Sequence, residues 1–265
     1  MDGEVRPAAV AGMFYEGDAR ALQTSVDAML ARADAAVVAA APKSPKVIIV
    51  PHAGHVYSGP IAATAYASVT SPDAIERIVL VGPSHRVFLE GVAAPSARAL
   101  RTPLGDVEVD RDAIDRAGIP VSDAPHAREH SLEVQLPFIQ RVFPNARVCP
   151  IVCGRASARE VADVIERLWG GPETLVVVST DLSHYLPYDV GRAADTRTAE
   201  KIVALDSDLD GEEACGYVGL RGLLEVAKKR GLSCKLLDLR SSGDIAGRAK
   251  GEVVGYGAFA LWEET

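Results

Sequence analysis

The chain has 265 residues, of which 48% are hydrophobic and 24% are charged, and its formal net charge is −8. It is long enough to bury a sizeable core, and the acidic balance argues against nucleic-acid binding as its main function. The apolar stretches are short and interrupted, and none approaches the roughly 20 residues that span a bilayer. Residues 1–4 lack the basic and apolar segments that open a signal peptide. We therefore expect a cytoplasmic protein with neither a nucleic-acid nor a membrane partner.

Short apolar runs rich in β-branched residues alternate along the chain with segments of helical periodicity. In chain order we expect a helix at about 18–38, a strand at 46–50, a helix at 61–69, a strand at 77–81, an inserted hairpin within 91–109, a helix at 133–143, a strand at 147–152, a helix at 157–169, a strand at 174–179, helices at 190–205 and 219–230, and closing strands at 234–239 and 253–261. Continuously apolar strands are typical of a sheet buried on both faces. The pattern predicts an α/β protein, a three-layer α/β/α sandwich with a mostly parallel or mixed central sheet, in which residues 1–265 form one domain.

The four cysteines do not form the framework of a small secreted protein. Cys149 and Cys153 fall in one predicted strand, where four residues span about 13 Å. A disulfide needs Cα atoms within about 7 Å of each other. We expect all four cysteines to be free thiols.

Three of the six histidines lie just past predicted strands. His52 follows the strand at 46–50, His85 follows the strand at 77–81, and His184 follows the strand at 174–179. The carboxyl ends of strands are where ligand crevices form in open α/β sheets. A lone histidine in such a place is more often a hydrogen-bonded loop residue, but three at equivalent positions favour a shared metal or catalytic site. Asp181, three residues before His184, adds a carboxylate that can orient an imidazole.

Two further segments carry candidate residues with open alternatives. Cys215 opens a helix-like segment, where the helix dipole favours a thiolate, so it is either a soft ligand or reactive thiol, or a structural cysteine. His130 and Glu133 either line the crevice as groups that transfer protons or orient a substrate, or form a capping cluster at the surface. The spacing matches no zinc finger and no helical His-Glu-x-x-His motif, so any metal ligands come from distant segments.

Several segments together resemble the Memo family and occur in that family's order. They are RPAAVAGMFY at 6–15, PHAG at 51–54, YSG at 57–59, GPSH at 82–85, EHSLEVQLP at 129–137, DLSHY at 181–185, CG at 215–216 and SGD at 242–244. Gly219 departs from the pattern, because members of the family commonly have proline there. A glycine makes the turn after Cys215 more flexible than a proline would, so the direction of the thiol is less constrained here than in those members.

The resemblance implies a fold similar to that of the class III extradiol dioxygenases. It places His52 and His85 at metal-histidine positions, Cys215 where the dioxygenases use glutamate, and His184 at their acid/base histidine, accompanied by Asp181. It implies a non-haem Fe(II) centre, although a thiolate ligand also suits copper or zinc. It further implies a small aromatic substrate and association with AMMECR-domain and radical SAM proteins. Prokaryotic members of the family are often called the B component of the AmmeMemoRadiSam system, which is named after this association.

Three functions stay open on the sequence. The first is an iron-dependent redox enzyme of the extradiol dioxygenase type, in which His184, Asp181 and His130 are the catalytic residues. The second is a non-catalytic protein that handles iron or copper or that holds a partner segment. The third is a zinc hydrolase with a bound water as nucleophile.

Overall fold

A mixed eight-stranded sheet forms the centre of the computed structural model, which describes residues 5–33, 43–247 and 251–263. Its strands are β2 (Val47–Val50), β3 (Arg77–Pro83), β4 (Val92–Ala93), β7 (Arg147–Cys153), β8 (Thr174–Ser179), β9 (His184–Pro187), β10 (Leu232–Ser241) and β11 (Glu252–Glu263). The order is β10-β11-β2-β8-β3-β7-β4, and β9 pairs with β11. Strands β2, β8, β3 and β7 are parallel, while β4, β9, β10 and β11 pair antiparallel.

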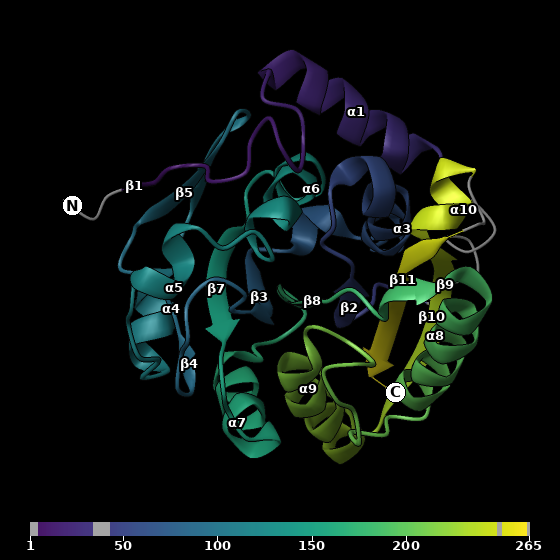
Figure 1. Cartoon of the computed structure of the whole chain (residues 1–265). Helices are drawn as coiled ribbons and strands as arrows, with labels where there is room; N and C mark the ends of the chain where they lie inside the picture. The colour runs from purple at the N-terminus through teal and green to yellow at the C-terminus, as the bar shows by residue number, and fades with distance from the viewer. Residues whose placement is uncertain (1–4, 34–42, 248–250, 264–265) are drawn as a thin grey trace.

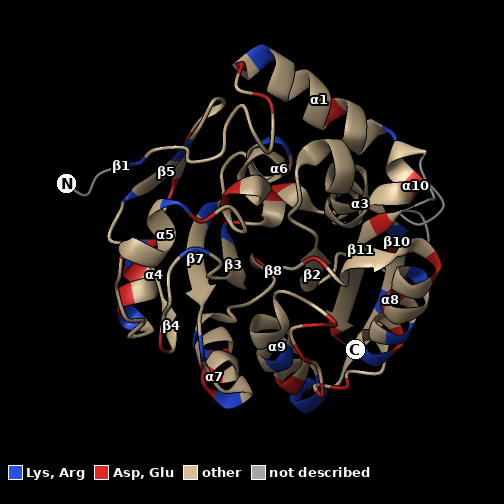
Figure 2. Cartoon of the chain, viewed as in Figure 1, with Lys and Arg blue, Asp and Glu red and all other residues tan. Residues whose placement is uncertain are grey.

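Helices cover both faces of this sheet, as the sequence predicted. They are α1 (Ala19–Ala31), α3 (His55–Ala67), α4 (Arg111–Arg116), α5 (Ala124–Ala127), α6 (Leu136–Val142), α7 (Ala158–Leu168), α8 (Tyr188–Val203), α9 (Tyr217–Arg230) and α10 (Ser242–Ala246), with 3-10 turns η1 (Pro72–Ala74) and η2 (Glu133–Gln135). Figure 1 shows α1, α3 and α6 on one side of the sheet and α7 and α9 on the other. Figure 2 shows basic and acidic residues interspersed along α4, α7 and α8.

The central strands are apolar throughout because both of their faces are covered. Every residue of β2 and β8 is buried. One continuous hydrophobic cluster contains side chains from Val10 to Trp262. The assignment of residues 1–265 to a single domain stays a prediction. No helix within 5–33, 43–247 or 251–263 combines the length and the apolarity that a membrane crossing needs.

The predicted hairpin within 91–109 is confirmed but belongs to a second sheet. Strands β5 (Ala99–Thr102) and β6 (Gly105–Glu108) pair antiparallel, with Thr102 opposite Gly105. The N-terminal strand β1 (Val5–Arg6) adds to β5 in parallel. This pairing brings the start of the chain to the loops that follow residue 90, which no local pattern indicates.

Two predicted helices have wrong boundaries. Helix α3 begins at His55 rather than at 61 and includes Pro60. A proline removes one hydrogen bond to the carbonyl four residues earlier, here that of Val56, and Val56 is exposed, so water can replace the bond. Helix α1 ends at Ala31, and residues 34–42, where the predicted helix continued into an alanine-rich run, lie outside the described residues.

Candidate metal centre

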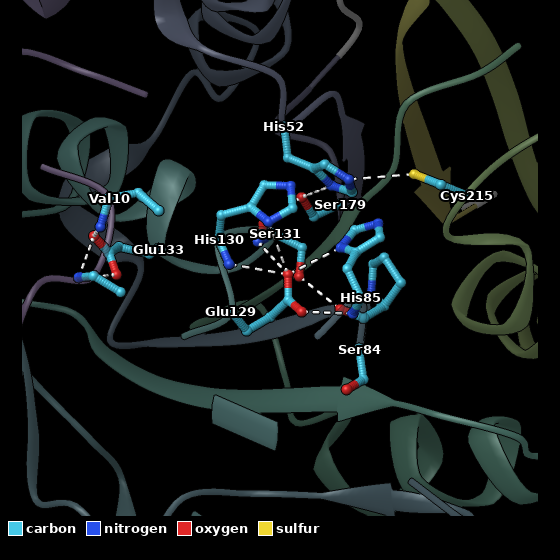
Figure 3. A network of polar contacts seen from close by, with 12 residues as sticks. Val10, His52, Ser84, His85, Glu129, His130, Ser131, Glu133, Ser179 and Cys215 are labelled. Carbon is cyan, nitrogen blue, oxygen red and sulfur yellow. Dashed lines mark hydrogen bonds and ion pairs between the residues drawn. The ribbon is translucent and has the colours of Figure 1, made fainter. Parts of the chain in front are cut away.

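Three histidines meet at the carboxyl edge of the parallel strands. His52 follows the last residue of β2 by two positions, His85 follows that of β3 by two, and His130 comes from the loop before η2. Their ring centroids are 5.2 Å apart for His52 and His85, 5.4 Å for His52 and His130, and 4.7 Å for His85 and His130. One ring nitrogen of each lies within 4.8 Å of the others, so the three can hold one metal ion (Figure 3).

A chain of hydrogen bonds fixes the tautomer of His52. The Ser179 hydroxyl donates its hydrogen to the Ser131 carbonyl at 2.7 Å. Its oxygen therefore accepts from His52 Nδ1, 2.9 Å away, and from Gln135 Nε2 at 3.0 Å. With the proton on Nδ1, His52 Nε2 carries the lone pair, which can bind a metal or accept a hydrogen bond from the Cys215 thiol 3.2 Å away. Burial first, and then the charges of His85 and His130, lower the pKa of His52 well below its usual value, so this imidazole is neutral.

A buried carboxylate, Glu129, holds the ring of His85 and the backbone of His130. It accepts hydrogen bonds from His85 Nδ1 at 2.9 Å, the His85 backbone at 2.6 Å, and the backbones of His130 and Ser131, each at 2.9 Å. Burial opposes its charge, but the His130 and His85 rings beside it outweigh burial and hold the pKa of Glu129 far below its usual value. A metal-binding histidine usually donates a hydrogen bond from its other ring nitrogen to a carboxylate, which fixes the orientation of the ring.

The donor set fits a metal ion. His52 and His85 each have Nδ1 engaged, so Nε2 carries the lone pair in both rings. His130 Nδ1 lies 3.2 Å from Glu129, but it is buried and has no hydrogen-bond partner among the described residues. Three clustered imidazoles cannot all be protonated without strong repulsion, whereas a central cation would satisfy their lone pairs.

Cys215 adjoins this group through His52. Its sulfur lies 3.2 Å from His52 Nε2. The Asp181 backbone N–H donates to the sulfur at 3.3 Å. The structure does not support the expected stabilisation of a thiolate by a helix start: α9 begins two residues later, and burial, followed by the charge of Asp181, raises the pKa of Cys215 to about 12. Its role as a ligand stays a prediction.

Asp181 and His184 lie near the histidines but contact different groups. Asp181 follows β8 by two positions, and its carboxylate accepts from the His52 backbone at 2.7 Å and the Ala53 backbone at 3.3 Å. It therefore fixes the turn that carries His52. His184 Nδ1 donates to the Leu182 carbonyl at 2.8 Å, which leaves Nε2 free to accept a proton. The charge of His184 also lowers the pKa of His52.

Three other candidate residues, Glu133, His55 and His126, are buried and support the fold rather than the site. Glu133 does not line the site: its buried carboxylate accepts from Arg6, from the Ala9 and Val10 backbones, and from the Tyr15 hydroxyl. The earlier interpretations, a crevice residue or a surface cap, are both wrong for this side chain. His55 and His126 are core residues bound to backbone carbonyls.

Sequence reasoning missed Glu129, and it expected His130 to transfer protons, orient a substrate or belong to a surface cap, but not to bind a metal. Neither follows a strand, so the strand-end rule did not reach them. The one local signal is their adjacency, because a carboxylate beside a histidine is a common ligand-support pair.

The fold and the site define a class: an α/β/α sandwich with a histidine-rich, metal-type centre at the carboxyl edge of its parallel strands. The chain belongs to the Memo family, since the family model described as "Memo-like protein" matches residues 6–260. The match includes every residue of the centre and both sheets except the first residue of β1 and the last residues of β11.

Curated relatives extend over the same length. The MEMO1 family protein of Caldivirga maquilingensis is 34% identical over 282 residues, covering 97% of this chain and 99% of the relative. That of Methanothermobacter thermautotrophicus is 33% identical over 274 residues, covering 95% and 98%. That of Ignicoccus hospitalis is 35% identical over 281 residues, covering 96% and 97%. The chain and these relatives therefore align from end to end.

Proposed function

We propose that this protein is a metal-dependent redox enzyme that uses mononuclear non-haem Fe(II), with an activity of the extradiol dioxygenase type. The observation that carries the proposal is the convergence of His52, His85 and His130, with ring nitrogens within 4.8 Å of one another. When bound, Fe(II) would supply one-electron chemistry with oxygen.

His52 and His85 are the first two ligands in this proposal. His130 and Cys215 compete for the remaining position. His130 has the better geometry, because one of its ring nitrogens lies within 4.8 Å of those of His52 and His85. The Cys215 thiol, in contact with His52 Nε2, becomes a ligand only on losing its proton, which a bound metal promotes.

His184 is the residue that moves a proton. Its Nε2 is free while Nδ1 is held by a backbone carbonyl, so it can take a proton from a substrate hydroxyl and return it. Asp181 supports the site by fixing the backbone of His52. Glu129 keeps the His85 ring in place and carries a compensating negative charge.

Two other functions have their own support. The Cys215 sulfur beside an imidazole is a soft donor that suits copper(I), which favours a non-catalytic protein that handles iron or copper or serves as a scaffold. Three neutral imidazoles also form a known catalytic zinc ligand set, which favours a hydrolase. Metal identity separates these from the iron enzyme.

The cellular compartment, the substrate and the partner proteins that we propose are those that the family resemblance implies. We place the protein in the cytoplasm, with a small aromatic substrate and with an AMMECR-domain protein and a radical SAM protein as partners. Pull-down of these two proteins with the chain as bait tests the partnership.

Oxygen uptake by protein loaded anaerobically with Fe(II), Zn²⁺ or Cu(I) tests the activity. With catechol-type compounds, uptake is expected only for the iron form. The His184→Ala variant should retain iron and lose roughly 10²- to 10⁴-fold in rate, because it lacks the proton carrier. Retained iron without oxygen uptake in the wild type would instead favour the metal-handling function.

A further inference from the structure

An open cavity of about 860 Å³ lies beside the metal centre. The N-terminal segment forms one wall with Val10, Met13 and Phe14. Arg86 and Val87 form the second wall, and α5 with Arg128 forms the third. The walls thus come from three parts of the chain that the fold brings together.

Three residues that line the cavity relate it to the histidine cluster, one through a ring contact and two through adjacency in the chain. The Phe14 ring lines it and lies 4.7 Å, centroid to centroid, from the His130 ring. Arg86 directly follows His85 in the chain, and Arg128 directly precedes Glu129. A molecule in the cavity therefore lies next to the metal-type centre, with Phe14 as the residue shared by both.

The walls combine exposed apolar side chains with two cations. Met13 is 73% exposed and Val87 is 37% exposed, although both are apolar and line the cavity. Arg86 and Arg128 form no ion pair and no side-chain hydrogen bond within the described part of the chain. Two guanidinium groups on the walls of one cavity favour an anionic ligand there, although the chain has a net charge of −8.

We propose that the cavity binds an apolar or aromatic carboxylate. Arg86 and Arg128 pair with the carboxylate, and Met13, Phe14 and Val87 contact the apolar body. That this ligand is the substrate rests on the proposed function; its chemistry rests on the cavity alone. Arg86 and Arg128 are then residues that determine specificity.

Calorimetric titration of metal-free protein tests the ligand chemistry of the cavity separately from the proposed enzyme function. The probes are phenylacetate and 4-phenylbutyrate, each paired with its neutral amide, which has nearly the same apolar body. The acids should bind more tightly than the amides, and Arg86→Gln or Arg128→Gln should weaken acid binding about fivefold each, because the pairs are solvent-exposed. The control is Arg221→Gln, an exposed arginine on α9 that should leave binding unchanged. Circular dichroism confirms the fold of each variant.

Equal binding of acids and amides, no binding of either acid, or Arg86 and Arg128 variants that match the Arg221 control would each overturn the proposal. Metal content is measured in parallel on reconstituted samples. Arginine-dependent acid binding by a chain that retains no metal would leave this inference standing and remove the proposed iron enzyme.

Discussion

Glu129 is the residue on which the geometry of the three-histidine cluster depends most. It is almost fully buried, yet it stays charged because hydrogen bonds from His85 and backbone N–H groups surround it. Glu133, four residues on, is equally buried but serves the N-terminal segment instead. The two carboxylates therefore allow the support of the metal to be separated from the support of the fold.

Glu129→Gln should weaken metal affinity about 10- to 100-fold, because the amide neither compensates the cation nor orients His85 as well. Competition with a chromophoric chelator measures this affinity. Glu133→Gln is the matched control, which should lower stability and leave metal affinity near that of the wild type. Equal losses of affinity in both variants would show that Glu129 acts only through folding.

His126 predicts a pH dependence of stability. Burial lowers its pKa to about 4, against 6.5 for an unperturbed histidine. Between these values the unfolded chain binds the proton and the folded protein does not. The free energy of unfolding should therefore fall as the pH drops from about 6.5 to about 4, by about 3 kcal/mol from this group.

Urea denaturation at several pH values checks this slope. His126→Gln, which can still donate to the Ala93 carbonyl, should show a visibly shallower fall over the same window. Parallel slopes for wild type and variant would mean that His126 is not the group responsible.

At the scale of elements, the sequence was enough to predict the central sheet and part of the site. A parallel strand that is covered on both faces is visible in the sequence as an unbroken apolar run. Because the carboxyl ends of such strands share one edge of the sheet, the sequence alone predicts that His52 and His85 lie close together. His130 and Glu129 could not, because the loop before η2 reaches the edge through tertiary packing. The pairing of β1 with β5, which crosses 94 positions between Val5 and Ala99, has no local signal either.

Close packing of α9 on α7 depends on Gly222. A Cβ at this position would lie 2.5 Å from Val161 Cβ and 2.9 Å from the Ala162 backbone nitrogen. Helix propensity alone predicts that Gly222→Ala stabilises the protein by about 1 kcal/mol. Steric overlap with the backbone opposes this, so we expect a net loss of about 1–3 kcal/mol in the free energy of unfolding. Urea denaturation decides the sign, and a stabilised variant would show that the helices separate freely.

At the scale of the whole molecule, all four cysteines are free, and burial raises the pKa of Cys149, Cys153 and Cys234 to about 12. Protein purified under argon without reductant should therefore yield four reactive thiols after denaturation and react slowly when native. Titration with a chromogenic disulfide reagent counts them. Two thiols in the denatured sample would reveal a disulfide that the fold does not contain.

The central claim concerns the whole fold, because its three histidines come from segments that only the folded chain brings together. Elemental analysis after identical anaerobic loading with Fe(II) and removal of excess metal tests it most directly. The wild type and His126→Gln should each retain about one metal ion per chain, whereas His52→Ala should retain far less, since it loses a ligand at the roughly 2 Å distance that metal–imidazole bonds require. Equal metal content in the wild type and His52→Ala, with the fold of both confirmed by circular dichroism, would contradict the assignment of a metal centre.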